Sequence, residues 1–305
     1  MPGSLTDLES LAGEFGLGRV HDATAIPGHP HVLRLATERG VFLVRPPDAD
    51  PGLYEQAALV LARAGIRQAV PLRTTAGSLV SESGLTVQEF LPGVACTSPS
   101  RTQTLATMRH VAAYHAALRA VPVPALPQSL WTRVTSADYL LAELPRLCRD
   151  DDVALLALDR LAASKPLLDA LPGQLVHGDI GPDNVLLDGD DVVAIVDFTP
   201  HHQPVLFAVA TAIYWYHVYG RDSLDPAVIS ASLAAAGPWT SAERAAWPAM
   251  LLREALRRYA TPFAVSEPAE PAEPADGPAS AVPSAVSPRH DALAVLTRRW
   301  SELAC

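Results

Sequence analysis

The sequence predicts an α+β fold in which a strand-rich N-terminal part precedes a larger, mainly helical part. Short β-branched and apolar runs separated by turn residues occur before residue 100. From Arg101 onward, apolar residues recur at three- and four-residue spacing. With 305 residues, of which 49% are apolar, the chain can bury a substantial core as one large domain or as two lobes.

Composition limits the classes of partner. The formal net charge is −10 and no basic cluster of the kind that follows a phosphate backbone occurs, so we expect no nucleic-acid partner. The acidic balance weakly favours a cationic substrate.

The three cysteines are too few and too scattered for a disulfide framework or a zinc site. No basic, apolar signal segment opens the sequence, and the most apolar run, Val205–Tyr216, is too short to span a bilayer. We therefore expect a cytoplasmic protein without a membrane partner.

The first hundred residues have the pattern of a small, sheet-containing unit. Apolar spacing predicts a short helix over Leu5–Phe15. Two strand-like runs follow at Val32–Leu35 and Val41–Val44, with a turn between them. Three further strands are predicted, at Val70–Leu72, Leu79–Val80 and Val87–Leu91.

The second part is predicted to be built mainly of helices. Helical spacing begins at Arg101 and recurs over residues 139–147, 153–171, 205–219, 226–236, 242–259 and 291–303. The helix over 242–259 is expected to carry Arg253, Arg257 and Arg258 on its outer face. Residues 266–288 alternate Pro, Ala, Glu and Ser with scarcely any large apolar residue, which predicts a disordered loop or spacer.

One stretch, Leu175–Phe198, organises the rest of the chain. Two strand-length runs, Val185–Leu187 and Val192–Val196, are joined through Asp188-Gly189, which predicts a β-hairpin. Asp179 and Asn184 lie on the loop before this hairpin, and Asp197 follows it. The hairpin should therefore bring two acids and one amide to the same end of a small sheet.

These three side chains suit phosphoryl transfer. The carboxylate of Asp179 can accept a hydroxyl proton. The oxygens of Asn184 and Asp197 are hard ligands for Mg²⁺, which takes few protein ligands and completes its shell with phosphate and water oxygens. Phosphoryl transfer needs little beyond a positioned hydroxyl and metal-neutralised phosphates. The alternative is that the two polar turns only flank a buried hairpin.

The same residues resemble the motifs of the aminoglycoside phosphotransferase family. His177-Gly178-Asp179, then Asn184, then Asp197-Phe198 are similar to its catalytic and metal-binding loops. The resemblance implies a two-lobed, protein-kinase-like α+β fold, with a nucleotide-binding lobe over residues 1–92 and a catalytic and acceptor-binding lobe over 93–305. It also implies ATP or GTP with Mg²⁺ as cofactors. The acceptor would be a small hydroxylated molecule: an aminoglycoside, another antibiotic, an amino alcohol such as homoserine or choline, or a biosynthetic intermediate.

The resemblance also assigns residues to the nucleotide. Arg45 stands where the family has a phosphate-binding lysine, and Glu55 in the next helix would be its ion-pair partner. Backbone groups of Glu89–Leu91, at the expected hinge, would meet the adenine edge. A loop around Gly28 would cover the phosphates, although a surface turn explains that loop equally well. His115 falls where the family has a buried histidine, and we expect a hydrogen-bonded core residue there.

Three features depart from the family pattern: Arg45, the proline-bearing loop around Gly28, and the stretch after Phe198. The family has an anchoring aspartate where this chain has Leu206-Phe207-Ala208. His201 and His202 are expected to line the acceptor side or a surface loop. These departures leave open a pseudokinase-like binding or scaffolding protein. A kinase acting on a peptide Ser or Thr is a further alternative, but no A-P-E-like motif follows Asp197.

Overall fold

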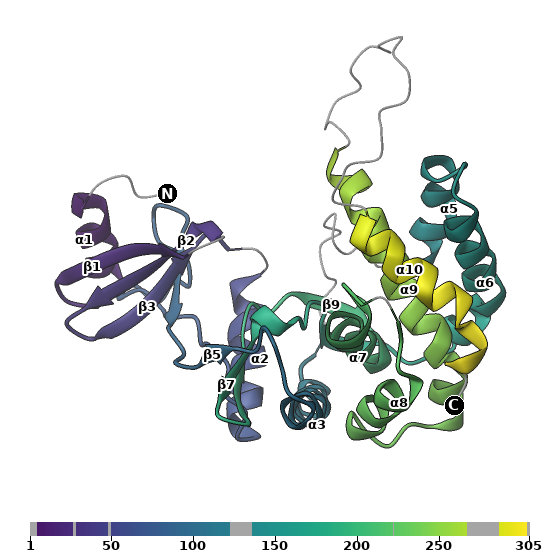
Figure 1. Cartoon of the computed structure of the whole chain (residues 1–305). Coiled ribbons are helices and arrows are strands. Elements are labelled where there is room, and N and C mark those ends of the chain that lie inside the picture. Colours follow the sequence, from purple (N-terminus) through teal and green to yellow (C-terminus); the bar gives the residue numbers. More distant parts are fainter. Residues whose placement is uncertain are drawn as a thin grey trace, which may run out of the picture.

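The computed structural model describes residues 5–26, 29–47, 50–122, 136–221, 223–266 and 287–303. As Figure 1 shows, a sheet with α1 lies at one end of the molecule and a group of helices lies at the other. The strands are β1 (Val20–Ile26), β2 (His29–Thr37), β3 (Gly40–Arg45), β4 (Thr86–Glu89), β5 (Val94–Ala95), β6 (Gln174–His177), β7 (Val185–Asp188), β8 (Asp191–Ile195) and β9 (Pro200–Gln203). The α-helices are α1 (Leu5–Glu14), α2 (Pro51–Arg63), α3 (Arg101–Leu118), α5 (Ala137–Leu147), α6 (Asp152–Asp169), α7 (Val205–Ile213), α8 (Pro226–Ala235), α9 (Ser241–Ser266) and α10 (Ser287–Arg298). Shorter turns are the 3₁₀-helices η1 (Pro182–Asn184) and η4 (Trp300–Glu302) and the π-helix η2 (Tyr214–Val218).

The N-terminal sheet is antiparallel, in the order β1-β2-β3-β4. Leu11 of α1 and Phe15, which directly follows this helix, pack on inward-facing Leu35 and Val44 and form a separate small core. The predicted helix and the predicted strands at β2, β3 and β4 are confirmed. Leu79–Val80 is not a strand, and Val70–Leu72 contributes only an isolated bridge from Pro71 to Gln88.

Strand β1 was not predicted from the sequence. Its residues, VHDATAI, are mostly exposed on both faces, as suits an edge strand, and so lack the apolar alternation by which strands are recognised.

Helix α2 connects the sheet to the helical part. It begins at an Asp50 cap, whose carboxylate accepts a hydrogen bond from the Gly52 N–H at 2.8 Å. Three of its four buried side chains, Leu53, Ala57 and Leu61, belong to the core of the helical part, and none belongs to the small core under the sheet. The helix that carries Glu55 is therefore fixed against the part of the chain that carries Asp179.

The chain passes from the sheet to the helical part through residues 90–95. Strand β5 pairs with β7, so the segment that leaves β4 joins the sheet of the predicted hairpin, in the order β5-β7-β8. Gly93 has φ +147, and a Cβ there would lie 2.8 Å from the Cβ of Leu186. A side chain at this position would push the two segments apart, so glycine is required for their close approach.

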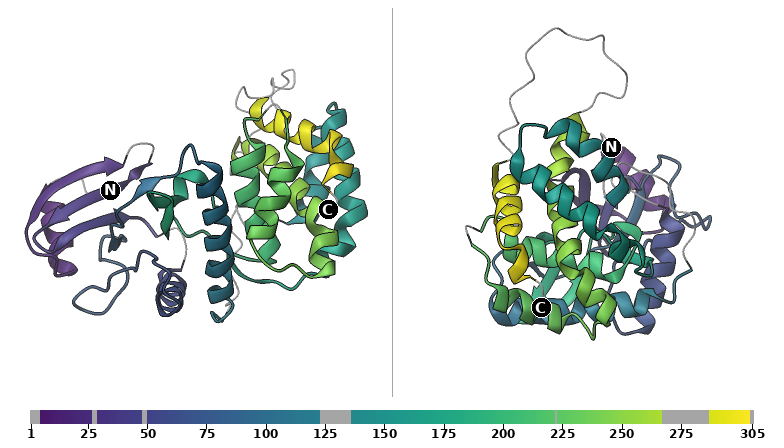
Figure 2. Two further views of the ribbon diagram at one scale, coloured as in Figure 1. Left: turned by 60° about the horizontal axis from the view of Figure 1, so that its bottom comes forward. Right: turned by 90° about the vertical axis from the view of Figure 1, so that its right-hand side faces the viewer.

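The helical part surrounds α7 and the π-helix that continues it. Every residue of α7 from Leu206 to Ile213 is buried, as its continuous apolar sequence predicts. Helices α5, α6, α9 and α10 pack together beside it (Figures 1 and 2). Strand β9, which pairs with β6, was not predicted, because Pro200-His201-His202-Gln203 carries no apolar alternation.

Two expectations concern residues outside the described part of the chain: the loop glycine Gly28, and most of the Pro- and Ala-rich segment 266–288. Within the described residues, no helix is both long and apolar enough to cross a membrane.

Candidate active site

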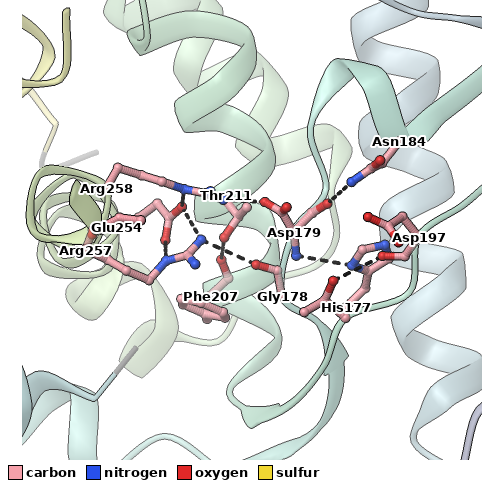
Figure 3. A network of polar contacts seen from close by, with 12 residues as sticks. His177, Gly178, Asp179, Asn184, Asp197, Phe207, Thr211, Glu254, Arg257 and Arg258 are labelled. Carbon is pink, nitrogen blue, oxygen red and sulfur yellow. Dashed lines mark hydrogen bonds and ion pairs between the residues drawn. The ribbon is translucent and has the colours of Figure 1, made fainter. Parts of the chain in front are cut away.

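The predicted loop, hairpin and second loop form one connected unit. Strand β6 ends at His177, and the chain then turns through Gly178–Gly181 into the 3₁₀-helix η1, which ends at Asn184. The amide Nδ2 of Asn184 donates a hydrogen bond to the backbone carbonyl of Asp179 at 2.8 Å. The Val196 N–H donates to the carbonyl of Asn184 at 2.9 Å, which brings the residue before Asp197 to the same place. Figure 3 shows Asp179, Asn184 and Asp197 as neighbours, with the Asn184 amide on the backbone carbonyl of Asp179.

Two neutral histidines hold this loop in place. The ring of His177 accepts a hydrogen bond from the Asp179 N–H at its Nδ1 (3.1 Å), and its Nε2 lies 3.0 Å from the carbonyl of Val196. The Nε2 of His115, on α3, accepts from the His177 backbone N–H at 3.2 Å, and its Nδ1 lies 2.8 Å from the Val111 carbonyl. Burial lowers the pKa of both rings, that of His115 to about 3. His115 is thus a hydrogen-bonded core residue, as expected.

Asp197 has an unusual backbone conformation. Within the described part of the chain it is the one residue other than glycine with a positive φ, 56°. Such a conformation is costly for a residue with a side chain and persists where the surroundings impose it, often at functional sites. The strained turn directs the carboxylate of Asp197 toward β3, where Arg45 Nη1 lies 2.6 Å from its Oδ1.

The predicted ion pair between Arg45 and Glu55 is wrong. Glu55 Oε1 and Oε2 instead accept hydrogen bonds from Arg73 Nε and Nη2, at 2.8 and 2.5 Å. Arg73 lies on the loop between α2 and β4 and presents its planar fork to the carboxylate, a geometry that favours this pair. Arg45 reaches Asp197 because β3 ends beside the hairpin loops.

The expected hinge residues lie at the end of β4 and just beyond it. The Phe90 N–H donates to the Val41 carbonyl at 3.1 Å, which extends the sheet by one bond. Leu91 is buried against Ala69 and Ala194, whereas the Glu89 side chain points outward and pairs with Arg67 at 2.7 Å. Beside this strand, a small cleft is lined by residues that include Arg45, Tyr54 and Gln88.

Three charged residues of α9 approach the loop from the other side (Figure 3). Glu254 accepts hydrogen bonds from Arg257 (Nε, 2.6 Å) and from Arg258 (Nε, 2.7 Å). Arg257 Nη2 also donates to the Gly178 carbonyl at 3.3 Å, and Arg258 Nη2 donates to Asp179 Oδ1 at 2.5 Å.

The expectation that the arginines of α9 lie on its outer face is therefore wrong. Arg253, Arg257 and Arg258 are buried, with exposed fractions of 5, 2 and 7%. Periodicity places charged residues outside by default, and it cannot detect a charge that is neutralised by a buried partner. The one local signal was the spacing of Glu254 three and four residues before Arg257 and Arg258, which permits helical ion pairs.

These contacts set the ionisation of Asp179. Partial burial acts to raise its pKa, but the nearby guanidinium of Arg258, assisted by Arg257, outweighs burial and holds that pKa below its ordinary value. Because its pKa is lowered, the carboxyl group of Asp179 is ionised at neutral pH. Its side chain retains an exposed fraction of 38% and is therefore accessible to a ligand.

Gly178 is explained by the strand beneath it. A Cβ at this position would lie 1.8 Å from Cδ2 of His201, which is 1% exposed. The expectation that His201 lines a surface loop or the acceptor side is therefore wrong, whereas His202 is exposed. The loop rests directly on the His201 ring, and only glycine permits that contact.

Two aromatic side chains, Trp215 of the π-helix and Tyr219 just after it, lie beside the arginine that holds Asp179. The guanidinium of Arg258 stacks on Trp215 with its central carbon 4.6 Å from the ring centre, and Trp215 packs edge-on against Tyr219 at 4.8 Å. Both Trp215 and Tyr219 are half-buried. An irregular helical turn of this kind often occurs at functional sites.

Comparison with known proteins identifies the family. Residues 28–252 match the sequence profile of the phosphotransferase enzyme family. The chain belongs to this family.

Curated relatives of this phosphotransferase-family protein match it over shorter segments. A homoserine kinase of Methylobacillus flagellatus is 38% identical over 91 residues, which make up 28% of each chain. A homoserine kinase of Methylobacterium nodulans is 30% identical over 149 residues, 45% of this chain and 44% of that one. The matched segments therefore span less than half the length of these relatives.

Solved structures show the same fold. An aminoglycoside phosphotransferase from Alicyclobacillus acidocaldarius superposes with a TM-score of 0.65 at 16% identity, covering 93% of this chain and 90% of that one. An amicoumacin kinase in complex with AMP-PNP and Ca²⁺ gives 0.66 at 16% identity, with 98% and 93% covered. A choline kinase from Streptococcus pneumoniae gives 0.64 at 10% identity, with 96% and 98% covered. The predicted family and the two-lobed, protein-kinase-like fold are confirmed.

The residues of this site fit a divalent cation only together with a nucleotide. The described part of the chain has no group of three or more His, Cys, Asp or Glu side chains that could hold a metal ion. Asn184 and Asp197 offer oxygen donors, and because Nδ2 of Asn184 is engaged by Asp179, its Oδ1 is the atom left for a cation. Two oxygen ligands, with phosphates and water supplying the rest, are typical of Mg²⁺ sites in proteins.

Proposed function

We propose that this protein transfers the γ-phosphoryl group of ATP, with Mg²⁺, to a hydroxyl group of a small molecule. The observation that carries the proposal is the convergence of Asp179, Asn184 and Asp197 on one side of the hairpin, with Arg45 reaching the same place from β3. A carboxylate base, two oxygen ligands and a phosphate-binding cation are the groups that phosphoryl transfer requires.

Each residue has a proposed role. Asp179 is the group that receives the acceptor hydroxyl: Oδ1 is held by Arg258, and Oδ2 accepts the hydrogen bond of the hydroxyl and orients its oxygen for in-line attack. Asn184 and Asp197 would hold Mg²⁺, which would neutralise charge on the β- and γ-phosphates. Arg45 contacts phosphate oxygens, and the backbone of Glu89–Leu91 binds the adenine edge. Glu55 acts at a distance, by holding Arg73 in the loop before β4.

The comparisons support an amino alcohol as the first acceptor to test. The curated relatives are named homoserine kinases, and one structural neighbour is a choline kinase. The accessible carboxylate of Asp179 and the aromatic side chains of Trp215 and Tyr219 suit a small polar molecule with an aliphatic body. Aminoglycosides and other antibiotics form the second group of acceptors.

The short connection from Asp197 to α7 argues against a peptide acceptor. Strand β9 occupies most of it, so the described chain has no long segment after Asp197 on which a peptide could lie.

The test is ATP-dependent phosphate transfer to a panel of hydroxylated amines, with wild type compared with Asp179→Asn. We expect turnover to fall by about 10³-fold in the variant, because it removes a group that acts on the reacting hydroxyl. Stabilisation by Mg·ATP in a thermal shift should persist. Asp190→Asn, in the exposed hairpin turn, is the matched control and should retain activity. Full turnover of Asp179→Asn would exclude the proposed role, and stabilisation by Mg·ATP without transfer to any acceptor would favour a binding or scaffolding protein.

A further inference from the structure

Helix α9 contains a buried charge cluster that local packing does not require. The side chain of Glu254 is fully buried and those of Arg257 and Arg258 have exposed fractions of 3 and 9%. Around them α9 presents apolar residues to the core, such as Leu251 and Leu256. Burying two guanidinium groups and one carboxylate costs desolvation free energy, and apolar residues of similar volume often stabilise a fold at least as well. A function other than stability would account for the cluster.

The cluster holds two consecutive residues of the catalytic loop. Glu254 binds Arg257 through two bonds, at 2.6 and 2.7 Å, and binds Arg258 through one at 2.7 Å. Arg257 then donates to the carbonyl of Gly178. Arg258 donates to the carboxylate of Asp179. Two neighbouring positions of α9 thus fix the backbone and the side chain of two neighbouring positions of the loop.

Aromatic rings fix the planes of both guanidinium groups. Arg258 lies over Trp215 at 4.6 Å and Arg257 lies over Phe207 at 5.4 Å. A planar group that is stacked on one face and hydrogen-bonded at its edge has little rotational freedom left. The Oδ1 atom of Asp179 is therefore held in one position, which also determines where Oδ2 points.

Among the described residues, the two histidines and Asn184 hold the backbone of the loop, but neither α7 nor β9 supplies a charged side chain to it. Helix α7, which packs below it, has the sequence VLFAVATAI and contains no charged residue. Strand β9 contributes the His201 ring, which packs under Gly178 but makes no hydrogen bond within the described residues.

We propose that Glu254, Arg257 and Arg258 form a positioning unit that orients the carboxylate of Asp179 toward the acceptor hydroxyl. The proposal rests on the proposed function, in which Asp179 receives that hydroxyl. Arg258 acts through the carboxylate of Asp179, and Arg257 acts through the backbone carbonyl of Gly178. Glu254 fixes the positions of both guanidinium groups by accepting their hydrogen bonds.

The first measurement is steady-state kinetics of Arg258→Gln. We expect kcat to fall by about 100-fold, the loss that a displacement of about 1 Å at reacting groups produces, with KM for Mg·ATP within about threefold of wild type. Arg258→Lys keeps the charge but loses the planar fork, so it should give an intermediate kcat. Arg253→Gln is the matched control. Arg253 is buried on the same helix and stacks on Phe207, but it donates to Gln203 at 2.7 Å and not to the catalytic loop. Its variant should lower the melting temperature and leave the kcat of the folded enzyme unchanged.

The second measurement separates positioning from stability. In an Asp179→Ala background, Arg258→Gln should cause no further loss of kcat, because the group that it positions is absent. If Arg258→Gln does not fold, Arg258→Lys serves in the same cycle. A wild-type kcat for the folded Arg258 variants, or an equal loss of kcat with and without Asp179, would overturn the proposal and leave the proposed function standing. Full activity of Asp179→Ala alone would overturn the proposed function itself.

Discussion

Arg45 on β3 and Asp197 after β8 form an ion pair across 152 positions of sequence, with Nη1 2.6 Å from Oδ1. The pair joins the N-terminal sheet to the hairpin that carries the other site residues. It also places the guanidinium of Arg45, which is proposed to bind phosphate, directly against Asp197, a proposed metal ligand. Binding of a magnesium–nucleotide complex should therefore draw this contact apart or share it with phosphate oxygens.

The first prediction concerns nucleotide affinity. Arg45→Ala should raise KM for Mg·ATP by about 10- to 100-fold, since a hydrogen bond between charged groups contributes roughly 1.5–3 kcal/mol. Arg45→Lys retains the charge and should remain within about tenfold of wild type, because only the two-pronged geometry is lost. Arg39→Ala, in the exposed turn between β2 and β3, is the control. Equal KM values for Arg45→Ala and wild type would show that Arg45 does not touch the nucleotide.

The second prediction concerns the loop glycine. Gly178→Ala places a Cβ 1.8 Å from the buried His201 ring, so either the loop or β9 must move. Overpacking of this kind costs about 1–3 kcal/mol of unfolding free energy, and displacement of Asp179 should abolish most activity. Denaturant unfolding and turnover measure the two effects. Gly13 lies in α1, and a Cβ added there would meet no atom outside its own helix backbone and chain neighbours within 4 Å. Gly13→Ala should therefore leave the free energy of unfolding unchanged or raise it by about 0.5–1 kcal/mol. Equal behaviour of the two variants would contradict the packing argument.

The third prediction separates side chain from backbone at the hinge. Glu89→Ala removes an exposed ion pair with Arg67, whose side chains are 46 and 49% exposed. It should cost less than about 1 kcal/mol and leave KM for ATP nearly unchanged, because the adenine contacts are assigned to the backbone. Leu91→Ala empties a buried position and should destabilise by about 2–5 kcal/mol. A large rise in KM for Glu89→Ala alone would mean that its side chain binds the nucleotide.

The fourth prediction is a pH dependence of stability. Burial lowers the pKa of His115 from 6.5 to about 3, so below pH 6.5 the unfolded chain binds a proton that the folded protein does not. The free energy of unfolding should therefore fall as the pH drops from 6.5 toward 3, by up to about 1.4 kcal/mol per pH unit from this residue. His115→Gln should show a slope smaller by about that amount in denaturant titrations between pH 4.5 and 6.5. Identical slopes would mean that His115 takes up a proton in the folded protein.

Local sequence predicted the hairpin and its three polar residues because all of them lie within one continuous stretch, Leu175–Phe198. Turn residues and β-branched runs determine where the strands and the turn of such a stretch form, and this fixes the positions of the polar residues that flank them. The helices of the second part could also be predicted, since apolar residues that recur at three- and four-residue spacing over ten or more positions fit a helix and not a strand. Strands β1 and β9 were not predicted, because neither has an apolar alternation and both form by pairing with neighbouring strands.

By itself, the sequence determined the fold class, the family motifs and the position of the candidate catalytic aspartate. Tertiary structure alone decided which cations reach the acids: Arg258 for Asp179 across 79 positions, Arg45 for Asp197, and Arg73 for Glu55. The physical reason is that an ion pair depends on which elements the core brings together, and periodicity treats every arginine as a surface residue until a buried carboxylate is placed beside it.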